Sequence, residues 1–236
     1  MTTGSEFLSF EVQRMRSYRL VVPALLSTLA LGMVPQRVEA QKATSIQDSW
    51  LWGAYGGYAS IPTVIATTNA PTVGIEWVIT RTRYALNVFA DQSYFNGIST
   101  VADYPTSAVR RVDIQDMRRV GFAGMIFTPE ISVIKPYFGF GYSFNFIKQA
   151  TPQGSTFSSA AARDTVLKRV ENSRAEGKVF GEFGVMGTYR RFSPFAQYVV
   201  MPTKGKGSWF VNGDGFTNMW QLGLRYNFGS AIEKRW

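Results

Sequence analysis

The sequence of 236 residues contains neither histidine nor cysteine. Histidine is the usual general base for a serine or water nucleophile at neutral pH, so the common hydrolytic mechanisms have no base here. Without histidine and cysteine the usual ligands of transition metals are also missing, and only carboxylate sites for hard ions such as calcium remain. The chain must also be stable without disulfide bonds. The sequence therefore predicts no catalytic residue, no metal site and no cofactor.

The chain has one long apolar run, at residues 20–34, and this run is too short for a membrane-spanning helix. It contains 15 residues and is interrupted by Pro23 and Gly32, whereas a spanning helix needs about 20 apolar residues. Arginines precede the run, and Val-Glu-Ala ending at Ala40 supplies the small residues that a signal peptidase recognises. The sequence predicts a cleavable signal peptide over residues 1–40, with a permanent helical anchor as the alternative.

Beyond residue 40, segments of about ten residues alternate in character and are separated by turn residues, as in transmembrane β-barrels. The clearest segment, 135–147, has an aromatic residue at every second position from Phe138, with glycine, serine or asparagine between them. In the first segment Trp50, Leu51 and Trp52 are adjacent, so its two faces are not resolved. The predicted strands are residues 50–60, 72–80, 83–92, 118–128, 135–147, 178–189, 194–201 and 218–228.

These segments predict an all-β fold, an eight-stranded antiparallel up-and-down transmembrane β-barrel over residues 41–236. Eight is an even number, as bacterial single-chain barrels require. The connections alternate between short turns and longer segments, and such barrels have short periplasmic turns and longer extracellular loops. The longer connections are expected at residues 61–71, 93–117, 148–177 and 202–217, which places both termini in the periplasm.

The alternation also assigns aromatic side chains to one face of the strands. Such a face suits lipid, and amphipathic rings suit the girdles at the two membrane interfaces. The residues expected to face lipid or to form the girdles are Trp77, Phe138, Phe140, Tyr142, Phe144, Phe146, Trp220, Tyr226 and Phe228.

Five charged residues fall on the opposite face of the strands. An arginine placed toward lipid at the membrane midplane costs about 2 to 4 kcal/mol, so these residues are expected inside. Eight strands enclose a space just wide enough for side chains to fill, which favours an interior polar network that closes the barrel. A gated ion path through rearranged pairs is the alternative. The five residues are Glu76, Asp91, Arg119, Glu182 and Arg225.

Three features of the predicted loops allow more than one interpretation. Residues 158–176 are rich in alanine and charge and predict a short helix, either simply solvated or a surface contact site. Trp209 and Phe210, close to two lysines, are candidates for contact with lipopolysaccharide or a partner. Residues 212–215, Asn-Gly-Asp-Gly, predict a turn because these residues tolerate left-handed backbone, with a calcium site as the alternative.

The sequence combines a predicted signal peptide, eight amphipathic strands, longer loops on one side and a last strand of Leu-Gly-Leu-Arg-Tyr-Asn-Phe at residues 222–228. In these features it resembles the small outer-membrane β-barrels that include OmpX and the OmpA transmembrane domain. The resemblance covers residues 46–228. It implies that the protein lies in the cell outer membrane of a Gram-negative-type bacterium, that the barrel-assembly machinery inserts it, and that it is a monomer. Family members usually end on the aromatic residue of the last strand, whereas here residues 229–236 follow.

The same resemblance bears on function. The enzymes known among outer-membrane barrels place a histidine in the catalytic group, and none of those mechanisms transfers to a chain without one. Removing residues 1–40 leaves 21 basic and 13 acidic residues, a formal charge of +8, so we expect contact with outer-membrane lipid and lipopolysaccharide rather than nucleic acid. The prediction is a non-enzymatic structural membrane component with loops for surface contact. The alternatives are a small porin-like channel and a soluble periplasmic lipocalin-like lipid-binding barrel, whose apolar face would point inward.

Overall fold

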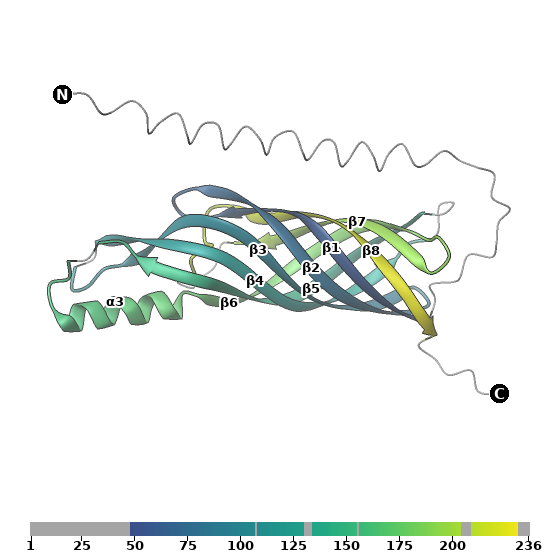
Figure 1. Ribbon diagram of the computed structural model, residues 1–236, viewed down its shortest axis with the longest axis horizontal. Coiled ribbons are helices and arrows are strands. Elements are labelled where there is room, and N and C mark those ends of the chain that lie inside the picture. The colour runs from purple at the N-terminus through teal and green to yellow at the C-terminus, as the bar shows by residue number, and fades with distance from the viewer. Residues whose placement is uncertain (1–47, 107, 130–133, 155, 204–208, 231–236) are drawn as a thin grey trace, which may run out of the picture. The chain divides into compact units, whose positions relative to one another are not determined.

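The strands close on themselves as a barrel. The computed structural model describes residues 48–230 except 107, 130–133, 155 and 204–208. In it, eight antiparallel strands pair in chain order and the first pairs with the last (Figure 1). The strands are β1 (Ser49–Pro62), β2 (Thr67–Arg81), β3 (Tyr84–Ala102), β4 (Val109–Phe127), β5 (Ile134–Pro152), β6 (Ala175–Gly187), β7 (Phe192–Pro202) and β8 (Phe216–Ser230). The predicted eight-stranded antiparallel barrel is confirmed, and the predicted signal peptide, residues 1–40, lies outside the described residues.

Three strands are much longer than predicted. β3, β4 and β5 each contain 19 residues, whereas a tilted strand crosses the hydrocarbon core with about 9–11. The extra length lies at the end that carries the connections 63–66, 103–108, 153–174 and 203–215, here named the loop end; the opposite end is the turn end. The prediction of loops over 93–117 and 148–177 was therefore wrong for most of the first and for the start of the second. The predicted loop over 61–71 was also wrong except at residues 63–66, because β1 ends at Pro62 and β2 begins at Thr67.

The outer surface of β4 and β5 changes from apolar to polar along the strands. On β4 the exposed residues Phe122 and Val120 give way to Arg118 toward the loop end, and on β5 the exposed residues after Phe146 begin with Lys148. An apolar exterior suits lipid and a charged one suits water. The change therefore marks where β4 and β5 leave the apolar band, and their polar exteriors explain why these two segments resemble loops in the sequence.

The register resolves the two faces of the first strand. Leu51 is fully buried inside the barrel, while Trp50 and Trp52 are exposed on the outside. Both outer rings pack on Trp77 of β2, with centroid distances of 5.5 and 5.7 Å. This indole cluster lies near the turn end, where an aromatic girdle is expected.

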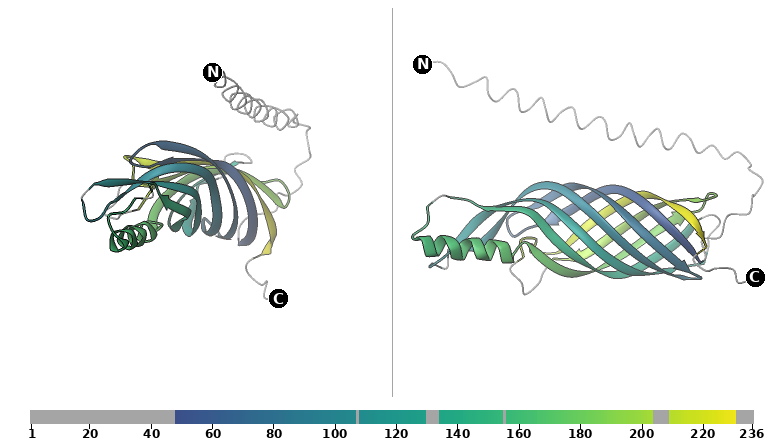
Figure 2. Two further views of the ribbon diagram at one scale, coloured as in Figure 1. Left: turned by 60° about the vertical axis from the view of Figure 1, so that its left-hand side comes forward. Right: turned by 60° about the horizontal axis from the view of Figure 1, so that its bottom comes forward.

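One helix, α3 (Ala160–Asn172), lies beside the loop end of the barrel (Figure 2). Its N-cap Ser159 accepts a hydrogen bond from the Ala162 backbone N–H, which satisfies one of the free donors of the first turn. Ala162, Val166 and Val170 are buried, so the interpretation of a simply solvated helix was wrong for this face. Among the described residues, no helix has the length and apolar character needed to cross a membrane.

Candidate functional site

An ion pair inside the barrel joins β2 to β8 across β1. Arg225 donates from Nε to Glu76 Oε1 at 2.8 Å and from Nη2 to Glu76 Oε2 at 3.1 Å, and both side chains are fully buried. The strand between them contributes Gly53, which is the register partner of both residues. A Cβ atom there would lie 2.8 Å from Glu76 Oε1 and 3.0 Å from Arg225 Cγ. Glycine therefore leaves the gap through which the two charges meet.

A second buried ion pair lies on adjacent strands. Asp91 of β3 and Arg119 of β4 are register partners, and the guanidinium binds the carboxylate through both Nε and Nη2. Tyr55 of β1 donates its hydroxyl to Asp91 Oδ2 at 2.9 Å. A buried arginine–carboxylate pair with two parallel hydrogen bonds and a further donor compensates for the loss of hydration.

Amide and hydroxyl groups add further hydrogen bonds to the interior. The Tyr137 hydroxyl donates to Gln197 Oε1 at 2.7 Å, and Gln197 Nε2 donates to Gln221 Oε1 at 2.6 Å. Arg225 lies 3.9 Å from the centroid of the Phe195 ring, within cation–π range. These contacts connect β5, β7 and β8 through the interior.

Glu182 is a third acid of the interior and differs from the other two. It is 4% exposed, and within the described part of the chain its Oε1 atom has no hydrogen-bond partner. The same holds for Arg119 Nη1. The gap lined by Glu182, Arg119, Gln197 and Gln221, among others, is too narrow to hold a water molecule.

The structure thus places all five charged residues predicted for the interior, Glu76, Asp91, Arg119, Glu182 and Arg225, inside the barrel, and it brings four of them together as two pairs. Their neutral partners Tyr55 and Gln197 were not predicted from the sequence. Gln197 lies on the same face of β7 as Phe195 and Val199, so the sequence showed no run of polar residues on that face. Tyr55 lies on the strand whose faces the sequence did not resolve.

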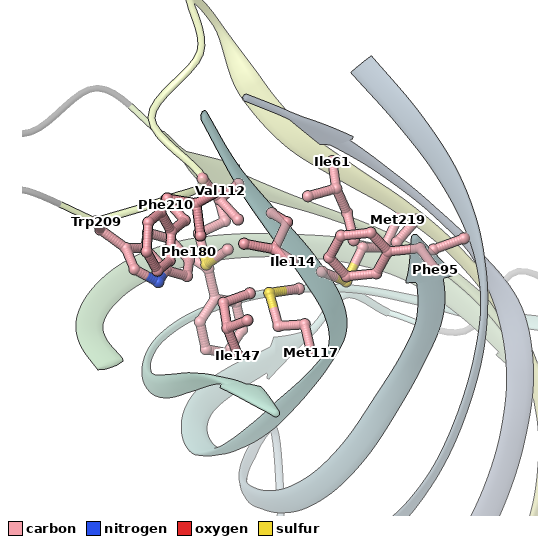
Figure 3. Packing of buried hydrophobic residues seen from close by; sticks show 14 of the residues in the cluster. Ile61, Phe95, Val112, Ile114, Met117, Ile147, Phe180, Trp209, Phe210 and Met219 are labelled. Carbon is pink, nitrogen blue, oxygen red and sulfur yellow. The ribbon is translucent and has the colours of Figure 1, made fainter. Parts of the chain in front are cut away.

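Toward the loop end, the interior is filled by apolar side chains. We define the apolar plug by the residues labelled in Figure 3: Ile61, Phe95, Val112, Ile114, Met117, Ile147, Phe180, Trp209, Phe210 and Met219. Trp209 and Phe210 belong to the connection 203–215 and are 2% and 0% exposed. The hypothesis that they contact lipopolysaccharide or a partner was therefore wrong, because both rings are buried among the apolar side chains of the interior. The two lysines near them, Lys204 and Lys206, lie outside the described residues.

Arginine side chains connect the segments at the loop end to one another and to the strands through hydrogen bonds. Arg110 donates to both carboxylate oxygens of Asp103, at 3.2 and 3.0 Å, and to three backbone carbonyls of the connection 153–157. Its guanidinium lies 4.3 Å from the Phe157 ring centroid. From α3, Arg169 donates to the Ala102 and Asp103 carbonyls. These contacts organise an ordered surface at the loop end.

The Arg110 contact yields a prediction for pH. Hydrogen bonds from Arg110, and then from the Tyr104 N–H, lower the pKa of Asp103 from its ordinary value of 3.8. A lowered pKa means that the contact is fully present above 3.8 and is lost only as the pH falls through the lower value. We expect the Gln153 amide, whose N–H donates to the Arg111 carbonyl, to keep its protection from hydrogen exchange, corrected for intrinsic pH dependence, from neutral pH to about pH 4. Arg110→Ala should reduce that protection at all pH values, because the carbonyls of this segment lose their side-chain donor, while Arg118→Ala, on the outer face, should leave it unchanged.

The nine aromatic residues predicted to face lipid all lie on the outside of the barrel. Six of them are among the exposed large hydrophobic residues, from 43% for Phe146 to 67% for Phe140, whereas Trp77, Tyr142 and Tyr226 are partly covered by neighbouring rings. The six exposed residues are Phe138, Phe140, Phe144, Phe146, Trp220 and Phe228.

Residues 212–215 form a compact turn against the start of the first connection. The Gly213 N–H donates to the Pro62 carbonyl at 3.2 Å, and Thr203 Oγ1 donates to the Gly213 and Gly215 carbonyls. Gly215 has a φ of +112°, in the region that favours glycine. Among the described residues there is no group of three or more acidic side chains that could hold a metal ion.

The fold has relatives among solved structures. The amino-acid sequence matches no protein-family profile and no curated protein sequence. The barrel is similar to neisserial surface protein A, at 14% identity and a TM-score of 0.50, over 76% of this chain and 97% of that chain. The chain folds as a transmembrane β-barrel. Matches with lower TM-scores include a de novo designed transmembrane β-barrel (10% identity, 78% of this chain and 98% of that chain, TM-score 0.42) and Ail of Yersinia pestis (11%, 77% and 100%, 0.42).

The arrangement of the two faces decides one of the alternatives. A lipocalin-like barrel would turn its apolar face inward around a ligand. Here the interior of the membrane-spanning part holds ion pairs and amides, and the outer surface carries Phe140, Trp220 and Phe228, each more than 60% exposed. The lipocalin-like alternative is therefore wrong for this barrel. The fold agrees with the small outer-membrane β-barrels that the sequence resembles.

Proposed function

We propose that the protein is a non-enzymatic structural component of the bacterial outer membrane, with a closed bore and an ordered surface at its loop end. The observation that supports this most strongly is the filled interior. Two buried ion pairs and the amide chain occupy the membrane-spanning part, and the apolar plug occupies the loop end. An eight-stranded barrel has just enough internal width for side chains, so little space remains for a conducting path.

The loop end is the surface on which contact with other molecules is proposed. β3, β4 and β5 extend beyond the apolar band, and α3 covers the plug through Val166 and Val170. With the loop end extracellular, this surface faces the medium, and exposed basic residues such as Arg118 and Lys148 lie where lipopolysaccharide phosphates are expected. The proposed partners are outer-membrane lipid and lipopolysaccharide, with assembly by the barrel-assembly machinery and function as a monomer without nucleic acid.

Planar-bilayer recording tests the closed bore. We expect no steady conductance from the inserted wild-type protein, because the ion pairs Glu76–Arg225 and Asp91–Arg119 and the plug block the path. As a matched comparison, the double variant Trp209→Ala with Phe210→Ala should still conduct poorly, since the ion pairs remain. A steady, voltage-independent current through the wild-type protein would support the porin-like channel instead.

A further inference from the structure

The outer surface over β5 to β8 carries a groove that is not explained by the interior or by the loop end. The groove has a volume of about 490 Å³, and none of the residues that line it is charged. We propose that it is a binding site for a single acyl chain of a membrane lipid. This inference rests on the proposed outer-membrane location.

One side of the groove is a row of aromatic residues. Phe138 of β5 pairs with Phe183 of β6, Phe183 with Tyr198 of β7, and Tyr198 with Trp220 of β8. The rings of Phe183 and Tyr198 are 5.2 Å apart and those of Tyr198 and Trp220 are 4.5 Å apart, measured between centroids. Four rings that are register partners form a ridge across the strands, perpendicular to their direction.

The next row toward the turn end is made of smaller side chains. Pro136 pairs with Val185, and Val185 pairs with Ala196. All three line the groove, and because they project less than the rings, the surface falls from the ridge to a floor. The depth of the groove therefore follows from a step in side-chain size between two neighbouring rows of the register.

The dimensions fit one acyl chain. Strands lie about 4.8 Å apart, so the ridge from β5 to β8 is about 14 Å long and the floor from β5 to β7 is about 10 Å long. Half of a hydrocarbon core of about 30 Å is about 15 Å, which is the depth that the acyl chain of one leaflet spans. Since barrel strands are tilted, the row is inclined to the membrane plane, and a chain that enters the bilayer from one surface can lie along it.

The apolar band argues for lipid rather than a second copy of the protein. The groove is continuous with the lipid-facing surface that includes Phe140 and Leu222, so acyl chains already cover its surroundings. A stable protein interface buries about 800 Å² on each partner, and a second convex barrel resting on the ridge would not reach the floor at Ala196. A flexible chain can follow the step and contact both rows.

Photo-crosslinking tests the site. The full chain is reconstituted in phosphatidylethanolamine–phosphatidylglycerol vesicles with a small fraction of phosphatidylcholine that carries a diazirine in its acyl chain, and crosslinked residues are mapped by mass spectrometry. We expect several-fold more crosslinks at Phe183, Tyr198 and Trp220 than on the outer face of β2 to β4. Ala196→Phe fills the floor and should cause a several-fold loss of the groove crosslinks. Ala90→Phe, a matched substitution on the outer face of β3, should leave them unchanged.

Three other outcomes would count against the acyl-chain site. Crosslinks spread evenly around the barrel, or unchanged by Ala196→Phe, would overturn the acyl-chain site while leaving the membrane location intact. Crosslinked protein dimers through Tyr198 or Trp220 in place of lipid adducts would show that a second copy occupies the groove. Protein that does not insert, recognised by the lack of a heat-dependent shift on a gel, would overturn the proposed location together with this site.

Discussion

Replacing Arg225 with methionine is expected to destabilise the barrel by about 3 to 5 kcal/mol, the cost of removing one partner of a buried ion pair. The substitution leaves the Glu76 carboxylate inside the barrel without the two hydrogen bonds that compensate for its lost hydration. It also removes the cation from above the Phe195 ring. Urea unfolding of the protein in lipid vesicles, followed by tryptophan fluorescence, measures the change.

The double variant Glu76→Met with Arg225→Met separates lost pairing from lost packing. Replacing a buried ion pair by apolar side chains of similar volume is often neutral or stabilising, so the double variant should recover most of the stability that Arg225→Met loses. If the double variant is as unstable as the single one, the pair does not act through its buried charges, and the interior network has a different energetic basis.

Replacing Phe140 with arginine is expected to destabilise the inserted protein by about 2 to 4 kcal/mol, the cost of an arginine on the lipid-facing surface near the midplane. Phe140 is 67% exposed on the outside of β5 and lies within the apolar stretch of that strand. In a water-soluble protein the same substitution at an exposed site would cost little. The same vesicle unfolding measurement tests it.

Thr151→Arg provides the control at a different depth on the same strand. Thr151 is exposed beyond the change from apolar to polar residues on β5, where an arginine should cost about 0 to 1 kcal/mol. Equal effects of the two substitutions would contradict the assignment of the apolar band to the membrane.

The barrel was predictable because strand alternation is a local property. In β5, aromatic residues at every second position from Phe138 to Phe146 specify both the strand and its outer face before any partner is known. The charged residues of the interior follow by the same alternation. In β1 the adjacent Trp50, Leu51 and Trp52 are compatible with either face of the strand pointing inward. Only the pairing with β2 and β8 places Leu51 inside.

The loop end was not predictable for a different reason. The outer residues of β4 from Arg118 to Arg111 are polar, so an extension of the strand into water has the composition of a loop. The burial of Trp209 and Phe210 depends on contacts with strands distant in sequence, such as the hydrogen bond from Ser99 Oγ to the Phe210 carbonyl. A sequence pattern carries no information on whether such a connection turns outward or folds into the barrel.

The central claim is that this chain is a lipid-facing barrel in the outer membrane, and cell fractionation followed by electrophoresis with and without boiling tests it most directly. A closed barrel embedded in the membrane keeps its compact form in detergent until it is heated. We predict that the protein is found in the outer-membrane fraction and that its mobility shifts on boiling. A soluble periplasmic protein with no heat-dependent shift would contradict the account.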